Sequence, residues 1–154
     1  QLMKKATILS LVIAMLIFAG CTSSGNNNER IEKNVYYGAI FEYKTNDKIE
    51  YKIIHRQEDV LNLISNFNSF AMEESNAQME EWIYRITFVK SFETADDKQS
   101  LAFSPDEEDL TVLVSENKIQ LGQQLYELSG TQYEIIKFKY DSWDYYDVIH
   151  ESIH

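Results

Sequence analysis

The chain has 154 residues, of which 44% are hydrophobic and 13% are aromatic, and it carries 14 Lys and Arg against 25 Asp and Glu, a formal net charge of −11. This length suits one domain, and the apolar content excludes an intrinsically disordered chain. The single Cys excludes an intramolecular disulfide framework and a Cys-rich zinc site, and the acidic balance argues against a protein that grips nucleic-acid phosphates with clustered cations.

The first 20 residues have the pattern of a secretory signal peptide. Met3-Lys4-Lys5 is followed by an apolar stretch from Ala6 to Gly20. A membrane-spanning helix needs about 20 apolar residues, so this stretch is short for a span. A basic start and a short apolar run that ends in small residues are typical of an export signal that is later removed.

The end of the apolar stretch indicates a lipid anchor. Leu16–Cys21 has the sequence Leu-Ile-Phe-Ala-Gly-Cys, and the chain turns polar directly after it. This hexamer resembles the lipobox of bacterial lipoproteins. The resemblance implies cleavage between Gly20 and Cys21, with at least two acyl chains on Cys21, enough to hold a protein firmly on a bilayer. The alternatives are a buried structural Cys and an ordinary cleaved signal peptide.

A tether is predicted between the anchor and the domain, over residues 21–34. Thr22 to Arg30 contains no apolar residue, so this stretch cannot bury surface to offset its ordering entropy. A single domain is expected over residues 35–149, followed by a polar tail over residues 150–154. Without its first 20 residues the chain carries 12 Lys and Arg against 25 Asp and Glu, a net charge of −13. Ordinary solvation explains such a charge, and attraction of a cationic protein, a peptide or Ca²⁺ is the alternative.

The first half of the domain is predicted to be a β-hairpin followed by a helix. Val35–Tyr43 alternates with period two, a turn follows at Thr45–Lys48, and Ile49–Ile53 alternates again. From Gln57 to Ala71 the apolar residues recur at helical spacing instead. The stripe of this predicted helix consists of Val60, Ile64, Phe67 and Ala71.

The second half is predicted to be a loop over residues 72–78, followed by strands and one short helical turn. The turn begins at Ser104, where Pro105 and Glu107 fit the first helical positions. The predicted strands are Glu80–Phe92, Gln99–Phe103, Leu110–Val114, Lys118–Leu121 and Tyr133–Tyr140. We therefore expect an α+β fold in which an antiparallel sheet of about six strands carries one main helix on one face. A partly closed β-barrel is the alternative.

A candidate binding surface follows the last predicted strand. Tyr140 to Asp147 contains four aromatic residues and three Asp, and as a strand it would place Asp141, Trp143, Tyr145 and Asp147 on one face. Aromatic rings beside carboxylates can stack on sugars, hold cationic side chains or line protein interfaces. The candidate residues are Trp143, Asp144, Tyr145 and Asp147. The alternative is a segment whose rings cover the edge of the core.

The other polar motifs favour no catalytic or metal site. His150–His154 matches H-E-x-x-H, in which two His on a helix bind Zn²⁺. We expect a chance match, because a catalytic zinc needs a third protein ligand and none follows His154. The acidic cluster Asp106–Asp109 lacks the spacing of an EF-hand loop. The spacing allows a hydrogen bond between His55 and Asp59, and no Ser or second Cys suggests a nucleophile nearby.

These observations predict a membrane-anchored extracytoplasmic lipoprotein that acts as a non-enzymatic binding or interaction module, with no cofactor. Its expected partners are the membrane, through the lipid anchor, and a cationic protein or peptide, but no nucleic acid. One alternative is an inhibitor or immunity-type lipoprotein that captures a basic protein or peptide. A remote alternative is a zinc-dependent hydrolase that uses the C-terminal HExxH match.

Overall fold

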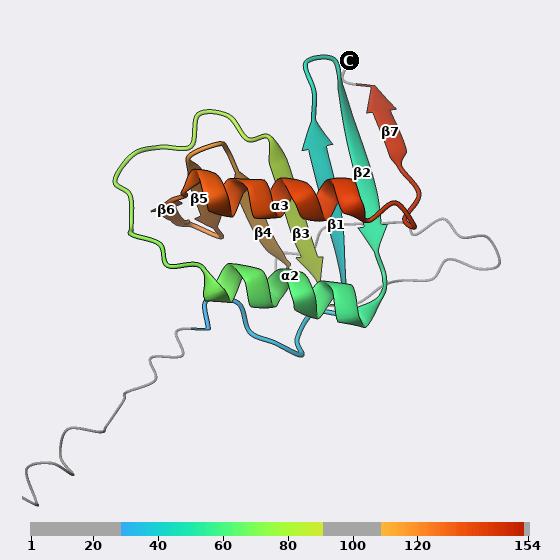
Figure 1. The fold of residues 1–154 in the computed structure, drawn as a ribbon, viewed down its shortest axis with the longest axis horizontal. Helices are drawn as coiled ribbons and strands as arrows, with labels where there is room; N and C mark the ends of the chain where they lie inside the picture. Colours follow the sequence, from blue (N-terminus) through green and yellow to red (C-terminus); the bar gives the residue numbers. More distant parts are fainter. Residues whose placement is uncertain (1–28, 91–108, 153–154) are drawn as a thin grey trace, which may run out of the picture.

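The computed structural model describes residues 29–90 and 109–152, which form an open antiparallel sheet of seven strands with two helices (Figure 1). The strands are β1 (Gly38–Lys44), β2 (Lys48–Ile54), β3 (Tyr84–Val89), β4 (Leu110–Val114), β5 (Lys118–Leu121), β6 (Gln124–Glu127) and β7 (Ile149–Ser152), and the helices are α2 (Gln57–Ser69) and α3 (Gly130–Ser142). The strand order is β6-β5-β4-β3-β1-β2-β7. The α+β prediction is confirmed, and the sheet is not closed into a barrel. The predicted strand Gln99–Phe103 and the helical turn at Ser104 lie outside the described residues.

The two predicted hairpins are present. β1 pairs with β2 across a turn in which the Thr45 amide donates to the Lys48 carbonyl at 2.9 Å. β4 and β5 have the predicted bounds and pair as expected. The sequence analysis missed β6, which continues this meander through a tight turn at Gly122, where φ is +61°. Glycine adopts this left-handed conformation without the steric cost that a side chain would bring.

Helix α2 forms where the helical spacing predicts it. Its buried residues are Val60, Leu63, Ile64 and Phe67. Acidic residues occupy its first turn, where they stabilise the positive end of the helix dipole. The helix ends at Ser69, two residues before the predicted end, and the loop predicted after it is confirmed.

The predicted strand Tyr133–Tyr140 is wrong, because this segment is the helix α3. Tyr133, Ile136 and Tyr140 also fit helical spacing, so the short apolar run matched both the two-residue period of a strand and the 3.6-residue period of a helix. A capping box begins the helix. The Ser129 hydroxyl accepts a hydrogen bond from the backbone N–H of Gln132 at 3.2 Å, and the side-chain oxygen of Gln132 accepts one from the backbone N–H of Ser129 at 3.0 Å. This Ser-x-x-Gln pattern is a helix-start signal that decides between the two periods.

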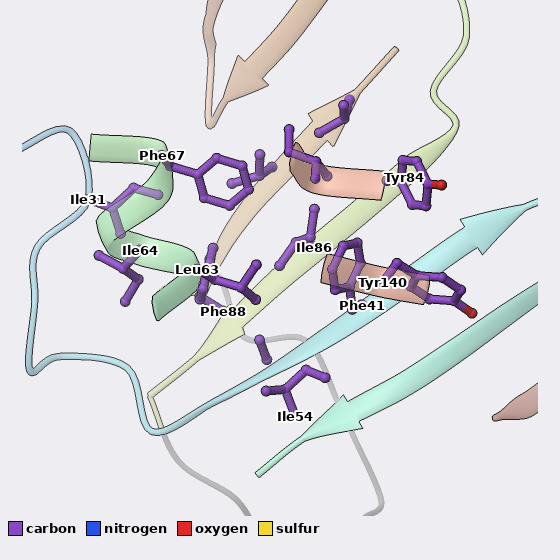
Figure 2. Packing of buried hydrophobic residues seen from close by; sticks show 14 of the residues in the cluster. Ile31, Phe41, Ile54, Leu63, Ile64, Phe67, Tyr84, Ile86, Phe88 and Tyr140 are labelled. Atoms are coloured by element: carbon purple, nitrogen blue, oxygen red, sulfur yellow. The ribbon is translucent and has the colours of Figure 1, made fainter. Parts of the chain in front are cut away.

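The core lies between the sheet and the two helices, which cross the same sheet face (Figure 1). Alternation along the central strands places the side chains of Phe41 and Phe88 on this face. Figure 2 shows Phe67 of α2 pointing toward the sheet and Tyr140 of α3 beside Phe41. The ring centroids lie 6.2 Å apart for Phe67 and Phe88 and 5.1 Å apart for Phe41 and Tyr140. Edge-to-face aromatic pairs therefore join each helix to the sheet.

The long strand predicted over Glu80–Phe92 is shorter in the structure, where β3 begins at Tyr84. A strand that began at Glu80 would place Trp82 on the same face as Tyr84, but Trp82 lies outside β3. The guanidinium of Arg85 lies 4.7 Å and the amine of Lys44 lies 5.3 Å from the centre of the Trp82 ring. Both cations belong to the sheet face opposite the helices, because they alternate with core residues along their strands.

The predicted domain boundaries are wrong at both ends. Ile31, assigned to the tether, is fully buried in the core. Its backbone exchanges two hydrogen bonds with the Asn68 side chain, and the Arg30 guanidinium donates to the Phe70 carbonyl at 2.8 Å. At the other end, the residues predicted to be a polar tail form most of β7, which pairs with β2. The domain therefore includes Arg30 and extends through Ser152.

Candidate functional site

The predicted binding residues lie in the turn that connects α3 to β7 and do not share a face. Trp143 follows the last residue of the helix, so this segment is not the strand that would have placed Asp141, Trp143, Tyr145 and Asp147 on one face. Trp143 is only 7% exposed and belongs to the core, as does Tyr146, whereas Tyr145 is 46% exposed. Asp144 and Asp147 are also exposed. The structure therefore separates the four predicted residues into one core residue, Trp143, and three surface residues.

Two tyrosines of this turn bind one carboxylate of α2. The hydroxyls of Tyr145 and Tyr146 both donate to Oδ2 of Asp59, at 2.7 and 2.6 Å. We call Tyr145, Tyr146, Asp59 and Arg56 the aromatic corner. The hydrogen bond that the spacing allows between His55 and Asp59 is not seen, and the His55 ring instead lies edge-on to Tyr146 at 5.2 Å. The corner thus joins the first turn of α2 to the end of α3.

The tyrosines of the aromatic corner hold their protons to high pH. Desolvation, together with the hydrogen bond to Asp59 and its charge, raises the pKa of Tyr145 to about 12. The same causes raise the pKa of Tyr146 further. Both hydroxyls therefore remain hydrogen-bond donors at neutral pH and are not poised to act as bases or nucleophiles.

A cation already lies on the exposed tyrosine. The guanidinium carbon of Arg56 is 4.4 Å from the centre of the Tyr145 ring. Such contacts contribute about 0.5–1 kcal/mol at exposed sites. The aromatic corner therefore combines an aromatic ring, a guanidinium and a carboxylate. These groups bind one another, and they suit non-covalent binding of charged or aromatic groups.

A buried lysine organises the end of α3. Lys52 of β2 is 4% exposed, and its amine donates to the carbonyls of Tyr140 at 2.5 Å and Trp143 at 3.1 Å. Tyr140 lies in the last turn of the helix, and Trp143 is its C-cap residue, whose carbonyl also accepts from the Tyr146 backbone N–H at 3.4 Å. A cation at this end of the helix also stabilises the helix dipole. Burial lowers the pKa of Lys52, and the charges of Asp141, Asp144 and Glu50 act against this change.

Three exposed carboxylates lie in the last turn of α3 and in the turn that follows it. We call Asp141, Asp144 and Asp147 the acidic rim. All three are exposed, and none forms an ion pair with another described residue. The C-terminal end of a helix carries partial negative charge, so carboxylates are unfavourable there and cations are favoured. The position of the acidic rim therefore does not serve the stability of α3.

The HExxH match does not form the helix that a zinc site of this kind requires. Ile149–Ser152 is a strand, in which successive side chains point to opposite faces. His154 lies outside the described residues. Among the residues that the structure describes, no group of three or more His, Cys, Asp or Glu is placed to hold a metal ion. Most of the acidic cluster Asp106–Asp109 also lies outside them.

One ion pair lies on the sheet face opposite the helices. The Arg85 side chain donates two hydrogen bonds to the Glu42 carboxylate, and the bond from its Nη2 measures 2.5 Å. Glu42 is buried, and the bond to its carboxylate raises the pKa of Arg85. Each charge satisfies the other, so the pair provides no unpaired group for a ligand.

The predicted cleavage and lipidation residues, Gly20 and Cys21, lie outside the described residues. No helix in the described ranges is both long and apolar enough to cross a membrane. Comparison of the chain with protein-family models, with curated proteins and with solved structures finds no match.

The sequence analysis missed three residues of this region: Lys52, Arg56 and the Asp59 carboxylate as a tyrosine acceptor. The sequence contained one signal for Lys52. Lys52 and Ile54 are two residues apart on β2, so their side chains point to the same face, and a charged residue therefore lies on the face that carries the core. No local signal linked Asp59 to Tyr145, because 86 positions separate them.

Proposed function

We propose that this protein is a lipid-anchored extracytoplasmic module that binds a cationic protein or peptide and catalyses no reaction. The observation that carries the proposal is the acidic rim, three exposed carboxylates without ion pairs among the described residues. Two of them, Asp144 and Asp147, belong to the same turn as Tyr145, whose exposed ring already contacts one guanidinium.

The location of the acidic rim supports binding over simple solvation. Carboxylates that only keep a protein soluble can lie anywhere on its surface, including helix N-termini, where they also add stability. Here they gather at a helix C-terminus, where they oppose the dipole and are partly offset by the buried Lys52. A basic partner would relieve this repulsion, because its charges would replace the cation that the helix end favours.

The chemistry of the aromatic corner supports a non-enzymatic role. Asp59 accepts from two tyrosine hydroxyls, and the pKa values of Tyr145 and Tyr146 are raised. A general base needs a free carboxylate or imidazole within reach of a substrate proton. The corner instead fixes the position of the turn that carries the acidic rim.

The anchor is tested by replacing Cys21 with Ala. The lipobox resemblance predicts that incorporation of labelled fatty acid is lost and that the protein stays unprocessed or leaves the membrane fraction. Unchanged labelling in Cys21→Ala would overturn the assignment of the anchor.

Binding is tested with a Lys-rich peptide and charge-neutralising variants. The combined variant Asp144→Asn and Asp147→Asn should weaken binding about tenfold or more, and raising the salt concentration should weaken binding to the unchanged chain. The control is Glu134→Gln, an exposed residue in the first half of α3. Equal affinity in all three proteins would contradict the proposed role of the acidic rim.

A further inference from the structure

The two edge strands of the sheet, β6 and β7, differ in whether another segment of the chain covers them. At the β6 edge, residues 73–75 run alongside the strand: the Ser75 amide donates to the Leu125 carbonyl at 2.9 Å, and the Glu127 amide donates to the Glu73 carbonyl at 2.8 Å. This segment covers the edge and satisfies its backbone groups. Such covering is one way in which proteins prevent unwanted strand pairing.

The β7 edge has no such cover among the described residues. β7 is the last strand in the sheet order and pairs only with β2. In an antiparallel ladder about half of the backbone N–H and C=O groups of an edge strand point away from its neighbour. The strand also contains neither Lys nor Pro, the residues that commonly protect such edges.

Apolar side chains accompany this edge. Val148 and Ile149 are both exposed, although they are large hydrophobic residues. Ile149 lies directly across from Tyr51 of β2, which is half-buried. An added strand would cover these side chains while it satisfied the outward backbone groups.

The charge around the edge selects the kind of partner. Glu50 and Glu151 lie in the β2–β7 ladder, and Asp147 directly precedes the strand. The Lys48 amine is already paired, because it lies 2.8 Å from the Glu50 carboxylate, and Nδ1 of the His150 ring lies 3.6 Å from the same carboxylate. The edge therefore presents a net negative surface to an incoming chain.

The same charge disfavours a second copy of this protein. A two-fold antiparallel pairing of β7 with itself would join two acidic chains, each with a net charge of −11. An extended cationic segment carries no such penalty.

We infer that the β7 edge accepts an extended cationic peptide segment as an eighth strand of the sheet. The inference rests on the proposed function for the charge of the partner, and it adds the binding mode. Backbone hydrogen bonds to β7 would supply affinity, and Glu50 and Glu151, which lie on opposite faces of the ladder, would favour Lys and Arg side chains of the peptide.

The test uses two synthetic peptides with the full chain. The first is a short peptide of alternating Lys and Val, and the second has the same sequence with every backbone amide N-methylated. The second peptide keeps the charge but has no backbone donors. We expect the first to bind at least about tenfold more tightly, since several hydrogen bonds distinguish the two.

Amide hydrogen exchange of β7 provides the structural readout. Outward-facing amides of residues 149–152 should exchange rapidly in the free protein and slowly in the complex. Slow exchange of all these amides before peptide is added would overturn the inference, because the edge would already be paired. Binding without any change at β7 would overturn it as well.

The two proposals fail in different ways. If both peptides bind equally and salt weakens both, capture of a cationic partner survives and the strand-addition mode is wrong. If neither peptide binds at low salt, the cationic partner and the binding mode are both wrong.

Discussion

Replacing Asp59 with Asn tests the aromatic corner. The carboxylate accepts from the Tyr145 and Tyr146 hydroxyls at 2.7 and 2.6 Å. A hydrogen bond to a charged group contributes about 1.5–3 kcal/mol, against about 0.5–1.5 kcal/mol for a neutral one. Asn retains an acceptor oxygen but loses the charge, so each of the two bonds should lose about 1 kcal/mol. We expect Asp59→Asn to lower the free energy of unfolding by about 2 kcal/mol, which moves the urea midpoint by about 1 M.

Glu58→Gln is the matched control for Asp59→Asn. Both residues lie in the first turn of α2, so both changes remove a favourable interaction with the helix dipole. Glu58 is exposed, and no tyrosine hydroxyl donates to it. The control should therefore lose only about 0.3–1 kcal/mol.

Tyrosine titration gives an independent measurement of the same contact. Asp59→Asn should lower the pKa of Tyr145 from about 12 toward its ordinary value, because the hydrogen bond and the neighbouring charge are lost while some burial remains. Glu58→Gln should change this titration much less. Equal loss of stability in the two variants, together with unchanged tyrosine titration, would refute the assignment of Asp59 as the shared acceptor.

Three further predictions concern the fold. Burial raises the pKa of Tyr84 and Tyr140, so the native state retains protons that the unfolded state loses above pH about 10. The contribution of these two tyrosines to stability should therefore be constant below that pH and fall as the pH rises beyond it, and a urea midpoint that did not fall at higher pH would contradict this. Phe67→Ala should cost about 3–5 kcal/mol because Phe67 is fully buried. Phe138→Ala should cost less than about 0.5 kcal/mol because Phe138 is 66% exposed, and similar urea midpoints for the two variants would be inconsistent with the packing of α2. Deleting residues 150–154 removes most of β7 and should cost about 1–2 kcal/mol, so an unchanged midpoint would show that the strand does not pair in solution.

The elements that were predicted correctly depend on local patterns. Leu110–Val114 and Lys118–Leu121 were predicted with their observed bounds, since the turn between them and the alternation on each side are both encoded within a few residues. The helix from Gln57 was predicted because its stripe continues over several turns. Tyr133–Tyr140 failed because a short apolar run fits both periods, and the Ser129 capping box was not used to choose between them.

The candidate site was only partly predictable. The sequence showed that aromatic and acidic residues gather between Tyr140 and Asp147, and Tyr145 does lie on the surface with Asp144 and Asp147. It did not show that Trp143 is buried, because the strand assignment placed the wrong residues on a common face. The direction of each side chain followed from the secondary structure, so one incorrect element regrouped the whole segment.

By itself, the sequence determined the acidic charge, the fold class, the helix α2 and the central hairpins of this protein. These properties depend on composition or on contacts between near neighbours in the chain. Only the tertiary structure decided that the Lys52 amine binds carbonyls at the end of α3 and that the Asp59 carboxylate accepts hydrogen bonds from two tyrosine hydroxyls. These partners are 86 to 91 positions apart in the chain. The tertiary structure also decided that residues 149–152 form an edge strand, since a strand of four residues is defined by the neighbour with which it pairs.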